Sequence, residues 1–503
     1  SVRGFVAFIS TCFYDNFYNF LDLFKATLAF LIPMYPTRTN TLQHVAAKAG
    51  LRIAIACLGL LCVACPEGAR AAQDEESAQH LESGSDSVVV VRRGESLLGI
   101  AARLLPATDF YTTGELAEGI RVASAIDSDR LMPGQTLHVP LVSGSRGRIA
   151  TDGTEVRGLY VTARTAGSAR ILALADSLIA VGGNTIIFDI KDRQGDLSYP
   201  SRVPLALATQ VDSLAPIRRP RALVRELHKR RLHVVARLTC FYDERLAVVR
   251  PELRPRSLSG DGAPWGKGWL DPSLPQVQDY LLEIVTEVSR FGVDEIQLDY
   301  VRFPTEGDLA DALFDFDTWH LAKHEVITEF VARTRGRLID TNVLLAADLF
   351  GVAAWGREAD LRRLGQKLTD LLPLLDVASP MLYPSHFFGP FLGIERPSDY
   401  PYYLVQAGLR RLKPLAEAHG VDVRPWLQAF SYGVTGFNEQ YVTEQILAAR
   451  DAGAQGWMLW HPANRFDVSL EAMRTLHNGR VVESSRRQPE FLGKQTVEGG
   501  SDM

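Results

Sequence analysis

Polar and aromatic side chains follow directly after buried strands at several points in the carboxyl-terminal two thirds of the sequence. The stretch GVDEIQLDYVRFP, residues 292–304, is the clearest case, because an apolar strand runs into Asp299 and then into Tyr300 and Arg302. A carboxylate in such a place can act as an acid, a base or a nucleophile. The cation and the aromatic ring beside it can orient a bound molecule.

The elements that position these side chains alternate regularly between strand and helix. Helical patterns such as SARILALADSLIAVG and QVQDYLLEIVTEVSRFG separate apolar runs, which predicts a parallel sheet covered on both faces. Eight such units over about 320 residues fit a (β/α)8 TIM barrel within an α/β fold better than the alternative, a doubly wound sheet. The predicted strands are 156–163, 184–191, 233–241, 294–303, 343–351, 377–385, 423–431 and 456–462.

In such a barrel the site forms at the carboxyl ends of the strands. Three aspartates there are catalytic candidates: Asp189, Asp299 and Asp348. Because side chains alternate along a strand, Asp299 points into the barrel mouth if Gln297 also faces inward. Aromatic rings, amides and cations at the other strand ends suit the faces and hydroxyls of a sugar. The predicted binding residues are Lys191, Arg237, Tyr300, Arg302, Tyr383, His386, Trp426, Gln428, Trp460 and His461.

Seven ordered motifs give the region from about Val156 to Phe466 a family resemblance. They are RGLYVTA, FDIKDRQG, QLDYVRFP, AADLFG, SPMLYPSHF, RPWLQAF and GWMLWHPANRF. The region resembles the bacterial putative glycosyl hydrolase domain family, whose members are expected to be glycosidase-like barrels. The resemblance implies that Asp299 is the nucleophile or base and that Asp348 is the matching general acid/base. Asp189 is the competing second carboxylate, and no metal or cofactor is expected.

Each of these residues also has a purely structural interpretation. Asp299 could form an ion pair with Arg302 at the barrel rim, and Asp189 could form a salt bridge with Lys191 across the mouth. Asp348 could cap a helix. The aromatic residues could belong to the core.

The amino-terminal part predicts export. Composition is that of a globular protein, with 46% hydrophobic and 22% charged residues, and the net charge of −5 gives no sign of nucleic-acid binding. Within residues 1–71, the apolar run IAIACLGLLCVAC and the small residues after it predict a signal peptide. Met34 is the expected start, with a second hydrophobic anchor at 1–33 as the alternative; lipidation of Cys65 is a further possibility. A membrane contact is expected only through such an anchor.

Three further segments are expected outside the barrel, which spans residues 155–478. Residues 72–87 are acidic and Ser-rich and predict a linker, and residues 479–503 predict a disordered tail. Residues 88–141, with RRGESLLGIA and MPGQTLHVP, resemble a LysM domain, a small β-α-α-β module that binds glycans containing N-acetylglucosamine. A structural cap is the alternative.

The sequence therefore predicts an exported glycoside hydrolase, located in the periplasm, the cell envelope or outside the cell. Its expected partner is a polysaccharide or a peptidoglycan-like glycan, cut by two carboxyl groups. The alternative is a non-catalytic glycan-binding or envelope-scaffold protein on the same barrel. A metal-dependent deacetylase would need His and Asp side chains to converge, which their spacing does not suggest.

Overall fold

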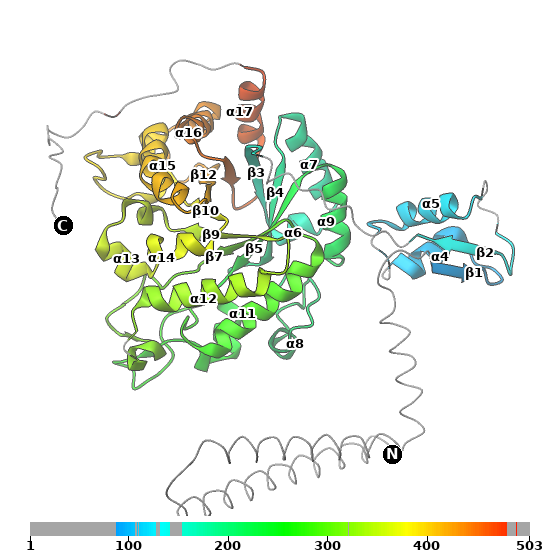
Figure 1. Ribbon diagram of the computed structural model, residues 1–503, viewed down its shortest axis with the longest axis horizontal. Helices are drawn as coiled ribbons and strands as arrows, with labels where there is room; N and C mark the ends of the chain where they lie inside the picture. Colours follow the sequence, from blue (N-terminus) through cyan, green and yellow to red (C-terminus); the bar gives the residue numbers. More distant parts are fainter. Residues whose placement is uncertain are drawn as a thin grey trace, which may run out of the picture. The chain divides into compact units, whose positions relative to one another are not determined.

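The computed structural model describes residues 87–479, except 106–107, 109, 127–130, 141–152 and 320, and it also describes residue 489 (Figure 1). The expected hydrophobic region and signal peptide, nearly all of the linker and nearly all of the tail lie outside the described residues. None of the described helices has the length and apolar character that crossing a bilayer requires.

The first described segment contains two strands and two helices. Strands β1 (Ser87–Val90) and β2 (Thr136–Val139) pair antiparallel, and helices α4 (Leu97–Leu104) and α5 (Thr113–Ala123) lie between them in sequence. Ser96 caps α4 by accepting a hydrogen bond from the Gly99 amide. The order of these elements is β-α-α-β, and both the LysM-like identity of this segment and its glycan binding stay predictions.

The rest of the described chain is built on one parallel sheet. Each strand pairs in parallel with its neighbours, in the order β11-β10-β9-β7-β5-β4-β3-β13-β12. All eight predicted strands contain a part of this sheet. The strands are β3 (Val156–Val161), β4 (Thr185–Lys191), β5 (His233–Thr239), β7 (Glu295–Asp299), β9 (Leu344–Leu349), β10 (Val377–Pro380), β11 (Asp422–Val423), β12 (Trp426–Gln428) and β13 (Gly456–Trp460).

The two end strands of this order are parts of one chain segment, residues 422–428. β11 pairs with β10, whereas β12 pairs with β13, and the Leu382 amide donates to the Trp426 carbonyl. Pro425 lies between the two parts and has no N–H to donate, which explains the interruption. Because the hydrogen bonding passes through this segment, the sheet curls on itself as in a TIM-like barrel.

Helices surround the outer side of the curled sheet (Figure 1). Helix α11 shows why they form: it begins at Pro275, and its buried residues recur at helical spacing, including Val277, Leu281 and Ile284. The long helices are α7 (Arg170–Ala180), α9 (Pro220–Lys229), α11 (Pro275–Val288), α12 (Lys323–Leu338), α15 (Pro401–Glu417), α16 (Glu439–Asp451) and α17 (Asp467–His477). The short α-helices are α6 (Ala163–Ala166), α8 (Pro204–Thr209), α10 (Glu244–Val249), α13 (Glu358–Leu364) and α14 (Leu368–Leu371).

The loops after the strands contain short elements that form the rim. Strands β6 (Arg256–Ser257) and β8 (Ala312–Leu313) pair antiparallel, although they belong to loops far apart in sequence. Short 3-10 helices fill other loops. They are Pro251–Leu253, Ser289–Phe291, Asp315–Trp319, Gly351–Trp355, Leu372–Leu374, Pro384–His386 and Pro397–Asp399.

The sheet separates two layers of core. Leu298 packs in the large cluster between strands and helices, whereas Ile187, Val235 and Met458 pack in a smaller cluster inside the curled sheet. Gln297 faces that interior, where its amide donates to the Ser379 hydroxyl over 3.1 Å. Gln297 thus meets the condition set for Asp299, and the alternation of the strand directs Asp299 inward as well.

Candidate active site

The guanidinium of Arg237, on β5, is the centre of the polar site. It donates hydrogen bonds to Asp189 on β4, over 2.5 Å, and to Asp299 at the end of β7. Its Nε lies 3.8 Å from Oδ2 of Asp348 on β9. These four strands are consecutive neighbours in the sheet. Burial alone would lower the pKa of Arg237, but the surrounding carboxylates, led by Asp299, raise it well above its ordinary value.

Asp189 uses both of its carboxyl oxygens within the protein. Oδ1 accepts from Arg237, and Oδ2 accepts from the hydroxyl of Tyr160 on β3. Burial raises the pKa of Asp189, and the Arg237 charge opposes this shift. Unlike Asp299 and Asp348, Asp189 does not line the pocket beside these carboxyl groups, so it holds its neighbours in place rather than meeting a bound molecule.

Asp348 keeps one carboxyl oxygen without a hydrogen-bond partner among the described residues. Oδ1 accepts from the indole N–H of Trp426 over 2.7 Å, and Oδ2 makes no hydrogen bond with the described chain. The residue is only 1% exposed. Burial, followed by the charge of Asp299, raises the pKa of Asp348 well above its ordinary value, and Arg237 only partly opposes this shift. Burial and a like charge are the two causes that favour the protonated form of a carboxyl group.

Asp299 is oriented by two hydrogen bonds. Oδ1 accepts from the backbone amide of Tyr300 over 2.6 Å, while Oδ2 accepts from Arg237. Tyr300 has φ of +50°, a left-handed conformation that is uncommon for a residue with a bulky side chain. Such backbone strain concentrates at functional sites. The predicted alternative, an ion pair between Asp299 and Arg302, does not occur among the described contacts.

A pocket of about 170 Å³ opens beside these carboxyl groups. It collects residues from the ends of β5, β7, β9, β10, β12 and β13, at the edge of the sheet where the prediction placed the site. Nine predicted residues line it, together with Phe350 and Met381, which were not predicted. The nine are Arg237, Asp299, Tyr300, Arg302, Asp348, Tyr383, His386, Trp426 and Trp460.

Aromatic rings form one wall of this pocket. The Trp460 ring lies 5.9 Å from the Tyr383 ring and 5.4 Å from the Phe430 ring. The His386 ring stands 5.2 Å from the Tyr383 ring, and the partial loss of solvent around the imidazole lowers the pKa of His386. These rings therefore do more than fill the core, because several of them border open space.

Three predicted binding residues lie outside the pocket lining. Lys191 is fully buried, with Nζ 2.9 Å from Asp243 and hydrogen-bonded to the Thr239 carbonyl. The register of β4 against β5 shifts between Asp189 and Lys191, and the alternative salt bridge between these two residues does not form, because Lys191 pairs with Asp243 and Asp189 pairs with Arg237. The Gln428 side chain accepts a hydrogen bond from the Ser385 amide and donates one to the Phe430 carbonyl.

His461 is the third of these residues. Its Nδ1 accepts from the Ala463 amide, and its ring lies 6.1 Å from the Phe466 ring. The other structural alternative, a helix cap by Asp348, does not apply either, because Asp348 lies within β9.

Two residues that position the site were not among the predicted site residues. Tyr160 lies one residue before the end of β3, where its hydroxyl holds Asp189. Asn464 accepts from the Thr162 amide and donates to the Tyr160 carbonyl, which joins the loop after β13 to the end of β3. A polar tip on an inward-facing aromatic residue is the signal by which Tyr160 could have been found.

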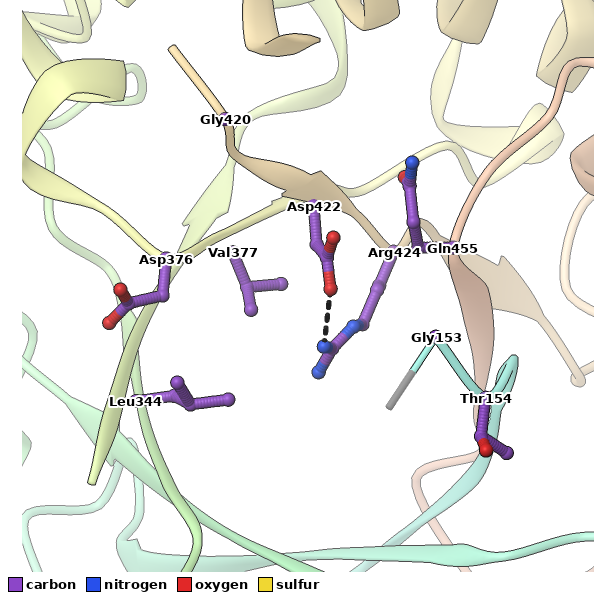
Figure 2. A pocket seen from close by; sticks show the side chains of 9 residues that line it. All are labelled: Gly153, Thr154, Leu344, Asp376, Val377, Gly420, Asp422, Arg424 and Gln455. Atoms are coloured by element: carbon purple, nitrogen blue, oxygen red, sulfur yellow. Dashed lines mark hydrogen bonds and ion pairs between the residues drawn. The ribbon is translucent and has the colours of Figure 1, made fainter. Parts of the chain in front are cut away.

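A second cavity of about 290 Å³ lies at the opposite, amino-terminal ends of the strands. The ion pair between Asp422 and Arg424, 2.7 Å, crosses it (Figure 2). Arg424 also pairs with buried Glu295 over 2.8 Å. Polar groups at this end of a barrel serve stability, whereas reactions take place at the carboxyl end. The cavity is lined by Gly153, Thr154, Leu344, Asp376, Val377, Gly420, Asp422, Arg424 and Gln455.

Solved structures similar to this chain include glycan-active proteins. A hypothetical protein from Ruminiclostridium thermocellum is 34% identical, over 38% of this chain and 96% of that one, with a TM-score of 0.34. The PgaB (BpsB) glycoside hydrolase domain from Bordetella bronchiseptica is 16% identical, over 64% and 99%, with a TM-score of 0.47. The spore cortex-lytic enzyme SleL from Bacillus cereus is 12% identical, over 78% and 86%, with a TM-score of 0.37.

None of these TM-scores reaches 0.5, so the likenesses support no further conclusion. No curated protein matches the chain. The model of one protein family, by contrast, matches residues 158–466, which is more than half of the chain and includes every carboxyl group described above. The chain therefore belongs to the putative glycosyl hydrolase domain family.

Proposed function

We propose that this protein is an exported glycoside hydrolase that cuts a cell-envelope or extracellular polysaccharide with Asp299 and Asp348. One observation carries the proposal: both carboxyl groups approach the Arg237 guanidinium at a pocket on the carboxyl side of the strands. Contact with one guanidinium keeps them within about 10 Å, close to the separations that two-carboxylate glycosidases use.

Asp348 has the features of the proton donor. Its Oδ2 makes no hydrogen bond with the described chain, and burial together with the Asp299 charge raises the pKa of Asp348, which favours the protonated form of the carboxyl group. A buried acid with a free oxygen can protonate the glycosidic oxygen as the bond breaks. When the proton has left, Nε of Arg237 at 3.8 Å stabilises the new carboxylate.

Asp299 is the partner that acts on the anomeric carbon, directly or through an activated water. The Tyr300 amide and Arg237 fix the direction of its carboxylate. Asp189 and Tyr160 hold Arg237 from the other side and are positioning residues. The aromatic wall formed by Tyr383, Trp460 and His386 offers faces on which a sugar ring can stack.

The cellular setting of the proposal comes from the sequence. The apolar run at 53–65, followed by Ala69-Arg70-Ala71, supports export. The β-α-α-β segment from Ser87 to Val139 would hold the enzyme on its glycan, if it binds as LysM domains do.

The experiment is hydrolysis of a panel of polysaccharides, peptidoglycan included, by the purified protein and by Asp299→Asn. Sugar release by the wild type that falls at least ~1,000-fold in the variant, with unchanged thermal stability, supports the proposal. An exposed substitution, Asp308→Asn, is the control and should leave release unchanged. Equal release by wild type and Asp299→Asn would overturn the proposed role of Asp299.

A non-catalytic glycan-binding protein is the second candidate. The pairing of Arg237 with both Asp189 and Asp299 favours it, because a paired carboxylate is a weaker nucleophile. This candidate predicts that a polysaccharide binds equally to wild type and Asp299→Asn and is cut by neither.

A further inference from the structure

We propose that Arg302 selects an acidic sugar, one that bears a carboxylate or another oxyanion, in the pocket of Asp299 and Asp348. The proposal rests on the proposed function and names the substrate class of the same site. Its starting point is a cation that lines the pocket without a carboxylate partner.

The hydrogen bonds of Arg302 leave one edge of its guanidinium open. Nη1 donates to the Phe303 carbonyl over 2.9 Å and to the Thr305 hydroxyl over 3.4 Å. Nε and Nη2 make no hydrogen bond to any described residue. Neither nitrogen is fully enclosed by the protein, so both remain in contact with solvent. These two nitrogens share one edge of the guanidinium, and a parallel pair of N–H groups on one edge is the arrangement that binds a carboxylate bidentately.

No carboxylate of the described residues forms an ion pair with Arg302 either. The residue is 7% exposed, and burial lowers its pKa. The charge of Glu306 is the largest effect that opposes this lowering of the pKa, but its oxygens accept from the Trp269 indole and from Thr305, and it forms no ion pair with Arg302. Arg237, the other arginine of the pocket, differs in this respect, because carboxylates already surround it. A buried cation without an ion-pair partner favours the binding of an anionic ligand.

Aromatic rings hold the guanidinium in place. Its central carbon lies 4.7 Å from the Phe350 ring centre, 4.9 Å from that of Trp269 and 5.5 Å from that of Tyr300. Cation–π contacts of this kind fix the side chain without using its hydrogen-bond donors. The open edge is therefore pre-organised, which reduces the entropy lost when a ligand binds.

The position of Arg302 connects this recognition with the reaction. Tyr300, Phe350 and Arg302 line the same pocket as Asp299 and Asp348. An acidic group on the sugar would meet repulsion from Asp299 unless a cation stood nearby. Arg302 supplies that cation, and a neutral sugar would leave it unpaired.

The test compares acidic oligosaccharides with counterparts whose carboxylates have been reduced to alcohols, and sulfated glycans with desulfated ones. Binding is measured by titration calorimetry with wild type, Asp299→Asn, Arg302→Gln and Arg193→Gln. Arg193 is the matched control, because it is an exposed arginine beside Tyr242 that pairs with Glu244 and does not line the pocket.

The wild type and Arg193→Gln should bind at least one acidic glycan roughly 100-fold more tightly than its neutral counterpart, as expected for a buried charge pair. Arg302→Gln should lose this preference while keeping its thermal stability. The comparison with carboxyl-reduced oligosaccharides tests whether the oxyanion is a carboxylate, and the comparison of sulfated with desulfated glycans tests whether it is a sulfate. Equal binding of every acidic and neutral pair by the wild type, or an unchanged preference in Arg302→Gln, would overturn the inference.

The same measurement separates this inference from the proposed function. Acidic preference in binding without any hydrolysis would support the role of Arg302 and reject the hydrolase. Hydrolysis of neutral glycans that depends on Asp299, without any preference for acidic glycans, would support the hydrolase and reject the role of Arg302.

Discussion

Trp426 donates its indole N–H to Asp348 over 2.7 Å, and the other carboxyl oxygen of Asp348 makes no hydrogen bond with the described chain. The two residues come from different strands, β12 and β9, which lie on opposite sides of β10 in the curled sheet. The contact orients a buried acid toward the pocket. It also acts on the proton affinity of that acid, because the N–H stabilises the ionised carboxylate.

Trp426→Phe should therefore change the pH dependence of the reaction. The indole hydrogen bond lowers the pKa of Asp348, so its removal should raise that pKa further. An acid must be protonated to act, so the alkaline limb of the pH profile of kcat/KM should move to higher pH. The control is Trp457→Phe, which removes a similar indole bond to Glu155 away from the site. A shift of the limb to lower pH in Trp426→Phe would contradict the assigned role of Asp348.

The ionised Asp348 carboxylate should also lower the free energy of unfolding at neutral and alkaline pH. Its pKa in the folded protein is raised above that of an unfolded aspartate. Stability from this group is thus fully present below the unfolded pKa and is lost as pH rises through the folded pKa. Asp348→Asn cannot titrate, so it should be more stable than the wild type at pH 8, by about 1.4 kcal/mol for each unit of upward shift. Urea unfolding at pH 4 and pH 8 measures this, and a gain that does not grow with pH would refute the expectation.

Asp311 offers a comparison of opposite sign for the same experiment. Its pKa is lowered by hydrogen bonds from Ser257 and Ser259. A group of this kind contributes stability above the unfolded pKa that is lost on acidification. Asp311→Asn should therefore be less stable than the wild type at pH 8, and this difference should shrink as the pH falls.

Arg237→Met should destabilise the fold strongly. It removes the cation that Asp189 and Asp299 share and leaves both carboxyl groups buried, at an expected cost of about 3–5 kcal/mol. The loss should be largest at high pH, where the carboxyl groups would be charged, and smaller near pH 4, where they can take up protons. Adding Asp189→Asn should restore part of the stability. Equal losses at both pH values would argue against the charge network.

Lys191→Met tests the role of the buried pair between Lys191 and Asp243. The fully buried Asp243 would lose its counter-ion, so unfolding free energy should fall by about 3–5 kcal/mol. The double variant Lys191→Met with Asp243→Asn should recover much of this loss, because the remaining charge is also removed. KM of the folded fraction should not change, since Lys191 is outside the pocket lining. A raised KM at unchanged stability would instead favour the substrate contact predicted from sequence.

The strands were predictable because burial on both faces makes them continuous apolar runs. The strands around Ile296, Leu345 and Leu459 can be predicted from their own apolar residues and spacing alone. The division of residues 422–428 into two short strands was not predicted, since it arises where Pro425 removes a ladder hydrogen bond between two partner strands.

The site was predictable only as far as strand ends could be identified. Asp299 and Asp348 follow from carboxylates at the ends of buried strands, and the structure brings both to one pocket. Asp189 pairs with Arg237 on the neighbouring strand, whereas Lys191 pairs with Asp243, and contacts between strands leave no simple sequence pattern. The link from Tyr160 to Asp189 depends on the neighbouring position of β3 and β4, and sequence spacing does not encode that contact.

The most direct test of the two-carboxylate account uses aryl glycosides of the sugar that the panel releases, with good and poor leaving groups. A poor leaving group needs protonation, whereas a good one does not. Asp348→Asn should lose roughly 100-fold or more in kcat on poor leaving groups and keep most of its activity on good ones, while Asp299→Asn should lose both. Equal losses of Asp348→Asn across the series would contradict Asp348 as the proton donor.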